Sequence, residues 1–168
     1  MRRTFLAGLA LAAGLIAPLL APDLAQAQTK PFGAGFDGWI FTATREPSGL
    51  TNCRATRRVG GRDDILAMRT DRHTYISIMG EGRKGKWPRS VVAVPGKPKG
   101  VADWSVTAEA NGARLWFPLD ESAVSDIAAA GYFQWSLMDS EDDGKVNLGK
   151  RAGEAWERVH QCVNANGG

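Results

Sequence analysis

The chain has 168 residues, and its 21 lysines and arginines against 18 aspartates and glutamates give a formal net charge of +3. This positive excess is too mild to indicate a nucleic-acid-binding protein. Six tryptophans are many for this length. Because each one can bury a large apolar area, we expect them to build the hydrophobic core.

The start of the chain follows the pattern of a cleaved secretory signal peptide, predicted over residues 1–27. Two arginines come first, an apolar run covers residues 5–20, and the small residues Ala25 and Ala27 precede Gln28. The apolar run is too short to predict a membrane span, although an uncleaved N-terminal anchor is the alternative. We therefore expect no transmembrane segment after cleavage.

The opening RRTFL also resembles the core of a twin-arginine export signal. An ordinary secretory signal that happens to hold two arginines is the other interpretation. Both interpretations predict a periplasmic or secreted protein.

The remaining residues, 28–168, are long enough for a single domain. They carry a net charge of +2, because the predicted signal holds two of the basic residues and one of the acidic residues. After a Gly- and Pro-rich lead-in at 28–37, apolar alternation and turn residues predict two hairpins. We expect their strands at 38–45, 50–59, 65–70 and 73–79.

The middle of the domain is predicted to pass through two loops and a further hairpin. In order, we expect a loop at 80–90, a strand at 91–94, a loop at 95–100 and the hairpin at 104–119. Asn111-Gly112, at the turn of this hairpin, is the strongest short hairpin signal in the chain.

The C-terminal part changes from strand to helix periodicity. A helix is expected at 122–131, with Ser122 as the N-cap and Gly131 as the stop. Strands at 132–138 and 145–148 follow, and then a last helix. The apolar side of that helix consists of Ala152, Ala155, Trp156, Val159 and Cys162. The predicted class is a β-rich α+β domain with a mainly antiparallel sheet or sandwich and two helices in its C-terminal part.

The two cysteines, Cys53 and Cys162, both lie in the predicted exported part. An even pair in an oxidising compartment predicts a disulfide. It would close a loop of about 110 residues and stabilise the fold by roughly 4–5 kcal/mol. A redox-active or metal-binding pair is the alternative, but the sequence has no C-x-x-C motif and no histidine at ligand spacing.

Several segments resemble the invasion-associated locus B family of exported proteobacterial proteins. They are the signal, NCRATRR at 52–58, AVSDIAAAGYFQWSL at 123–137 and VNLGKRAGEAWERVHQC at 146–162. The resemblance implies an exported β-rich protein without enzymatic activity. It also implies a link to envelope integrity or host-cell colonisation.

A Gly-rich basic loop, predicted within 82–99, is the best candidate for a binding site. Its charged and aromatic residues include Arg83, Lys84, Lys86, Trp87 and Arg89. A basic loop with an exposed aromatic side chain could bind an anionic surface polymer, a lipid headgroup or a protein partner. The alternative is a solvated loop with the tryptophan tucked beneath it.

The segment 52–58 adds Arg54, Arg57 and Arg58. On a strand, Arg54 and Arg58 share one face and Arg57 takes the other. Salt pairing with carboxylates is the favoured explanation for these charges.

The acidic turn at 139–144 resembles the start of a calcium-binding loop. Asp139, Glu141 and Asp143 occupy positions 1, 3 and 5, but Lys150 stands where a bidentate glutamate is required. A solvated hairpin turn is the favoured interpretation, and weak cation binding remains open.

The sequence contains no G-x-S-x-G, H-E-x-x-H, P-loop or dinucleotide motif. We therefore predict no catalytic residue, no metal site and no cofactor, and we expect a non-catalytic binding protein of the cell envelope. A hydrolase with paired carboxylates is one alternative. The other is an inhibitor of a hydrolase or protease that presents the Pro-stiffened segment 86–90.

Overall fold

The computed structural model describes residues 27–96, 103–138 and 140–168. Its described part forms one domain of ten strands and two helices. In chain order these are β1 (Gln28–Pro31), β2 (Trp39–Arg45), β3 (Thr51–Val59), β4 (Arg62–Arg69), β5 (Thr74–Met79), β6 (Lys84–Ala93), β7 (Asp103–Asn111), β8 (Arg114–Leu119), α1 (Glu121–Ala130), β9 (Tyr132–Ser136), β10 (Asp143–Asn147) and α2 (Ala152–Ala165). The predicted β-rich α+β class is confirmed.

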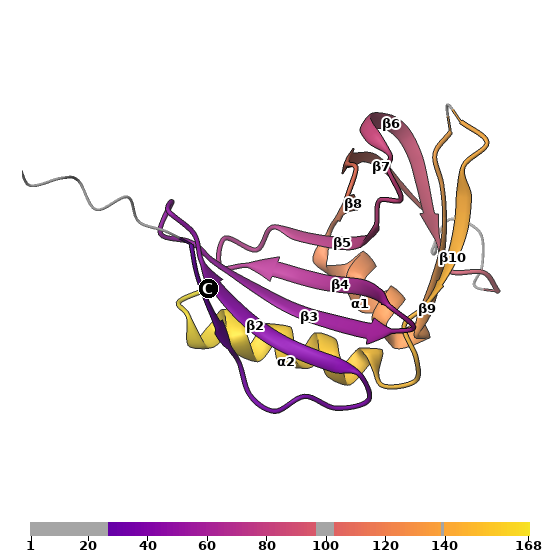
Figure 1. The fold of residues 1–168 in the computed structure, drawn as a ribbon. Helices are drawn as coiled ribbons and strands as arrows, with labels where there is room; N and C mark the ends of the chain where they lie inside the picture. Colours follow the sequence, from indigo (N-terminus) through magenta and orange to yellow (C-terminus); the bar gives the residue numbers. More distant parts are fainter. Residues whose placement is uncertain (1–26, 97–102, 139) are drawn as a thin grey trace, which may run out of the picture.

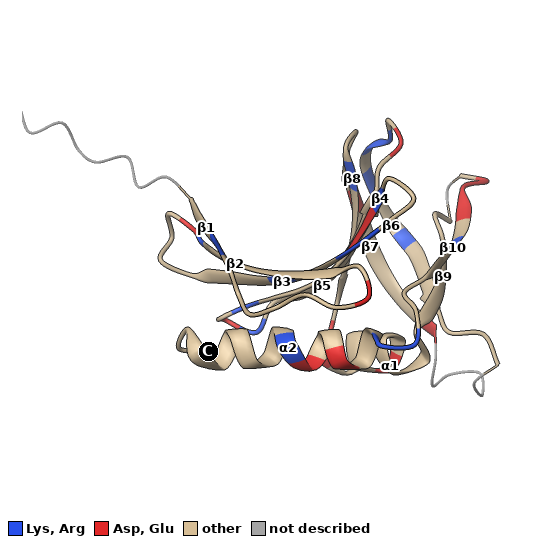
Figure 2. Cartoon of the chain, turned by 60° about the horizontal axis from the view of Figure 1, so that its bottom comes forward, with Lys and Arg blue, Asp and Glu red and all other residues tan. Residues whose placement is uncertain are grey.

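All ten strands belong to one antiparallel sheet with the order β1-β2-β3-β4-β5-β8-β7-β6-β9-β10. The sheet is strongly bent: β2 and β3 lie over α2, whereas β9 and β10 stand at a steep angle to them (Figures 1 and 2). The two helices lie side by side on one face of the sheet (Figure 2). This bend turns the last strand, β10, toward the ends of β3 and β4.

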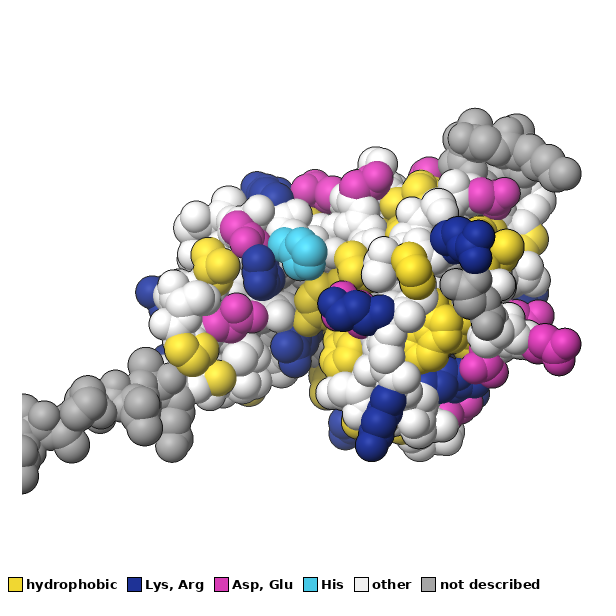
Figure 3. Space-filling model, turned by 90° about the horizontal axis from the view of Figure 1, so that it is seen from above, with side chains coloured by type: hydrophobic (Ala, Val, Ile, Leu, Met, Phe, Trp, Pro, Cys, Tyr) yellow, Lys and Arg dark blue, Asp and Glu magenta, His cyan; other side chains and the backbone are white. Residues whose placement is uncertain are grey.

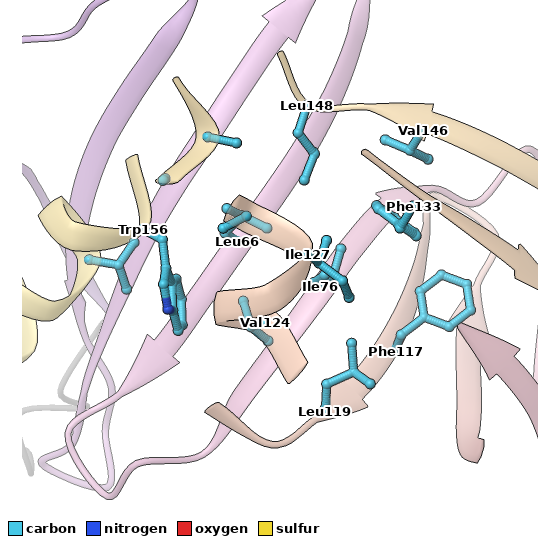
Figure 4. Close-up of a cluster of buried hydrophobic side chains, with 14 of the residues drawn as sticks. Leu66, Ile76, Phe117, Leu119, Val124, Ile127, Phe133, Val146, Leu148 and Trp156 are labelled. Atoms are coloured by element: carbon cyan, nitrogen blue, oxygen red, sulfur yellow. The ribbon is translucent and has the colours of Figure 1, made fainter. Parts of the chain in front are cut away.

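The core lies between the helices and the face of the sheet that the bend encloses. Strand alternation places Leu66, Ile76 and Phe117 on that face, and all three are fully buried. Val124 and Ile127 of α1 pack onto them (Figure 4). Hydrophobic burial on this face is what holds the bent sheet to the helices.

The tryptophans only partly follow the expectation that they build the core. Trp39, Trp135 and Trp156 are buried, and Trp87 and Trp104 are partly buried against the same cluster. The remaining tryptophan, in β8, pairs with Ser77 of β5 and so lies on the opposite face of the sheet.

The N-cap of helix α1 lies two residues before the predicted one. Asp120, not Ser122, is the N-cap, and its carboxylate accepts a hydrogen bond of 2.7 Å from the N–H of Ala123. The carboxylate outcompetes the serine hydroxyl, which instead donates to Asp120 at 2.8 Å. Gly131 ends the helix with a φ of 73°, as predicted, because this left-handed conformation favours glycine.

The predicted disulfide between Cys53 and Cys162 is confirmed. It joins β3 to α2 across 109 positions of sequence, with a Cα–Cα distance of 5.9 Å. A disulfide fits an exported protein, because such bonds persist in oxidising compartments. The predicted signal peptide lies almost wholly outside the described residues. Among those residues, no helix has the length and apolar character needed to cross a membrane.

The lead-in at 28–37 contains a strand that the sequence does not predict. Its first residues form β1, which pairs with β2 from Gln28↔Arg45 to Pro31↔Thr42. Thr29 and Thr44 are also linked by a 2.9 Å hydrogen bond between their hydroxyls. This strand depends on its pairing with β2, and local composition therefore could not reveal it.

Candidate anion-binding site

The predicted basic loop is wrong as a structural assignment, because most of it is the strand β6. Residues 84–93 pair with β7 along one edge and with β9 along the other. A bulge between Trp87 and Ser90 interrupts the pairing. Segment 86–90 is therefore part of the sheet and not the protruding loop expected of an inhibitor. The end of the predicted loop, at 97–99, lies outside the described residues.

Arg83 is held by the protein itself. Its guanidinium donates to Asp142 at 3.0 Å and to Glu81 at 3.2 Å, and it lies 5.4 Å from the centre of the Trp135 ring. The side chain is only 19% exposed. The bond to Asp142 raises the pKa of Arg83 and lowers that of Asp142. Arg83 thus fixes the β9–β10 turn and offers little charge to a ligand.

The other residues predicted at this site do not converge. Lys86 pairs with Glu109 at 2.6 Å, and Trp87 packs partly buried against the core. Lys84 and Arg89 are exposed. The view from above shows Lys and Arg side chains interspersed with Asp and Glu, with no broad field of one sign (Figure 3). Trp87 is the aromatic residue of segment 83–89, and it is only partly exposed, whereas the prediction required an exposed one.

Four other cations gather where β10 approaches the ends of β3 and β4. They are Arg57 of β3, Arg62 of β4, Lys145 of β10 and Lys150, which follows β10. We call this group the cationic seam. It lines two cavities of about 330 and 290 Å³ that share Arg57, Lys145 and Asn147. Lys150 lines the first cavity and Arg62 the second.

Arg57 is the anchor of the cationic seam. It lies opposite Trp39 of β2 and Asp64 of β4, near the end of β3. Its Nη1 donates to the backbone carbonyl of Asn147, so the guanidinium ties β3 to the last strand. Gly149 fits closely beside it: φ is 82° there, and a Cβ would lie 3.2 Å from Nη2 of Arg57. A larger residue at 149 would push the guanidinium away.

Most of the positive charge of the cationic seam has no carboxylate partner. Arg62 is 3.7 Å from Glu81, and both side chains are more than half exposed. Nζ of Lys145 lies 5.2 Å from the centre of the Tyr132 ring, a cation–π contact. Within the described part of the chain, Arg57, Lys145 and Lys150 form no ion pair. Their charge is therefore available to an anion.

Asp64 is the one carboxylate that lines these two cavities among the described residues. It is only 8% exposed, and its Oδ1 is buried without a hydrogen-bond partner. Burial raises the pKa of Asp64, although Arg62, Arg114 and Arg57 oppose the rise. An ionised carboxylate at this position is therefore costly to the folded protein, although three arginines lie near enough to stabilise it.

Replacing Asp64 by asparagine should raise the free energy of unfolding at pH 7 by roughly 1 kcal/mol, because a neutral amide avoids the cost of burying an ionised carboxylate. A raised folded-state pKa means that the folded protein binds this proton more tightly than the unfolded chain does. Protonation therefore relieves the cost as the pH falls, and the advantage of D64N should shrink toward about pH 4. Urea denaturation of both proteins at the two pH values tests this. A D64N variant no more stable than wild type at pH 7 would contradict it.

The other arginines of the segment 52–58 fit the expectation of salt pairing in part. Arg58 makes a two-point bond to Asp63, with both distances 2.9 Å. This contact raises the pKa of Arg58 and lowers that of Asp63. Arg54 and Arg58 share one face and Arg57 takes the other, as predicted. Salt pairing does not explain Arg57, which binds a backbone carbonyl instead.

The acidic turn offers poor geometry for a cation. Asp139 lies outside the described residues, and Asp142 is occupied by Arg83. Across the described ranges, no three His, Cys, Asp or Glu side chains gather as a metal site would require. Glu81 and Asp143 both line a cavity of about 220 Å³, together with Arg62, Arg83 and Lys145. Glu81 is paired with those arginines, so the arrangement does not single out an acid and a base.

Comparison of the chain with protein-family models, curated proteins and solved structures finds no match in any of the three. The resemblance to the invasion-associated locus B family therefore stays a prediction.

Proposed function

We propose that this protein is an exported, non-catalytic binding module of the bacterial envelope and that it holds an anionic partner in the cationic seam. The observation that carries the proposal is the convergence of Arg57, Lys145 and Lys150 on adjoining cavities, with no ion pair to neutralise them in the described chain. The predicted signal and the Cys53–Cys162 disulfide support the location.

The residue types suit recognition of carboxylate, phosphate or sulfate groups. A guanidinium is planar and presents several donors, so Arg57 can bind an anion while it keeps its bond to Asn147. The two lysines act as mobile point charges at the rim, and both are exposed. Interactions of this kind weaken as salt rises, because exposed charges are screened.

The test is a pull-down from envelope extract with the oxidised mature domain, at low and at high salt. Wild type is compared with the double variant K145Q/K150Q and with the matched control K84Q/K86Q. Both variants remove two exposed lysine charges. We expect wild type and the control to retain a partner that high salt releases. The affinity of K145Q/K150Q for that partner should fall roughly tenfold, as the loss of two ion pairs predicts.

Equal binding by all three proteins would overturn the proposal. Loss of binding in K84Q/K86Q alone would place the binding site in segment 83–89, which the sequence predicts to be a basic binding loop. Failure to retain any partner at either salt would also count against a binding module and would favour a catalytic role.

A further inference from the structure

Strand β10 has one edge that no other described strand covers. It stands at the end of the sheet and, within the described residues, pairs only with β9 (Figure 1). The N–H of Leu148 donates to the carbonyl of Gly131, and the N–H of Leu137 donates to the carbonyl of Asp142. These two bonds show which residues of β10 direct their backbone groups toward β9 and which direct them away.

In an antiparallel pair, hydrogen-bonded residues alternate with residues whose backbone groups point away. Residues 142, 144, 146 and 148 therefore direct their backbone groups toward β9. Asp143, Lys145 and Asn147 direct theirs to the free edge. The bond from Arg57 to the carbonyl of Asn147 agrees with this assignment, since it arrives from the side opposite β9.

The free edge of β10 lies beside cavities as well as beside the cationic seam. Cavities of about 290 and 220 Å³ lie along it, and Lys145 lines both. The ends of β3 and β4 reach β10 through the side chains of Arg57 and Arg62, and neither strand pairs with it. The bent sheet therefore stops short of closing on itself, and open backbone groups lie beside the cations of the cationic seam.

We infer that β10 binds an extended acidic peptide segment, which adds to its free edge as a further strand. This inference rests on the proposed function and names the partner class. Backbone hydrogen bonds to Asp143, to Lys145 and to the N–H of Asn147 would supply affinity, while the carbonyl of Asn147 keeps its bond from Arg57. Acidic side chains at alternate positions of the peptide would face the cationic seam and supply specificity, because alternate side chains of a strand share one face.

An extended peptide matches both features of this edge. A lipid headgroup or a phosphate-rich polymer satisfies the charges of Lys145 and Lys150 alone. A peptide satisfies them and also supplies N–H and C=O groups at the strand spacing. Uncovered strand edges are known sites of pairing with other chains, which is why proteins commonly block them.

The experiment uses the oxidised mature domain and a synthetic peptide of about six residues, a typical strand length, in which glutamate alternates with valine. Amide hydrogen exchange is followed by NMR with and without the peptide. The N–H groups of Asp143, Lys145 and Asn147 should exchange at least tenfold more slowly in the complex. Those of Gly144 and Val146, which point toward β9, should change little. Unchanged exchange at all three outward amides in a saturated complex would overturn the inference.

Two further peptides, compared with the K145Q/K150Q variant, separate this inference from the proposed function. Both have the same sequence and charge as the parent peptide; one is N-methylated at the odd residues and the other at the even residues, and each methylation removes the N–H donors on one edge of the peptide. If the peptide adds to β10 as a strand, the peptide whose methylated edge faces β10 should bind at least tenfold more weakly than the parent. One of the two methylated peptides should therefore lose affinity. If both methylated peptides bind like the parent peptide while K145Q/K150Q still loses binding, the strand model is wrong and the anion site stands. If K145Q/K150Q binds the parent peptide as wild type does, both proposals fail.

Discussion

Replacing both cysteines by alanine lowers the free energy of unfolding by about 4–5 kcal/mol, the largest loss that we expect from any small change. The bond between Cys53 and Cys162 spans 109 positions, and a closed loop of that size removes much of the entropy of the unfolded chain. Both residues are buried, at 0% and 2% exposure, so the bond also sits where β3 meets α2. Without it, that junction depends on side-chain packing alone.

Urea denaturation of wild type and C53A/C162A measures this loss, and wild type under reducing conditions is the natural control. Reduction should reproduce most of the effect, since it breaks the same bond without changing the chain. A loss below 1 kcal/mol in both experiments would contradict the argument. It would mean that the chain between the two cysteines is already restricted when unfolded.

Truncating Phe117 to alanine should cost about 3–5 kcal/mol, the range for large aromatic residues in a packed core. The side chain has no exposed surface. It lies edge-on to Phe133 (Figure 4), with ring centres 6.4 Å apart and planes at 76°. The centre of its ring is also 5.9 Å from that of Trp135. Since Phe133 and Trp135 belong to β9, this contact holds the steep part of the sheet against β8.

The matched control is Met138→Ala, because Met138 is a large apolar residue that is 58% exposed. Its truncation should change stability by less than about 0.5 kcal/mol. Thermal and urea unfolding of both variants would show the contrast. If F117A is within 1 kcal/mol of wild type, the core does not depend on this aromatic contact in the way described.

The local features of the fold could be predicted from the sequence. Turn residues and apolar alternation identified β2 to β5 and the β7–β8 hairpin, and Gly131 marked the end of α1. The disulfide followed from two cysteines in a chain with a predicted export signal. The strands and the helix end follow from residues that are close together in the sequence. The disulfide follows because the chain has only two cysteines, so each has one possible partner within the chain.

The candidate site could not be predicted, because its parts meet only through the bend of the sheet. Arg57 and Lys145 come from strands at different places in the chain, and no local pattern shows that β10 faces the end of β3. The composition of segment 83–89 favoured a loop. Its pairing with β7 and β9 instead makes it a strand. Two of its charged residues form ion pairs, Arg83 with Asp142 and Lys86 with Glu109. Both the missed site and the wrongly predicted loop therefore have the same cause, which is strand pairing between segments far apart in the sequence.

The most direct test of the cationic seam is an NMR titration of the oxidised domain, residues 28–168, with a short glutamate-rich peptide at low salt. We predict that backbone amide shifts concentrate at Arg57, at Arg62 and along 145–150, and that they disappear at high salt. Shifts confined to 83–89, or the absence of any shift at saturating peptide, would contradict the assignment of the anion-binding site to this edge of the sheet.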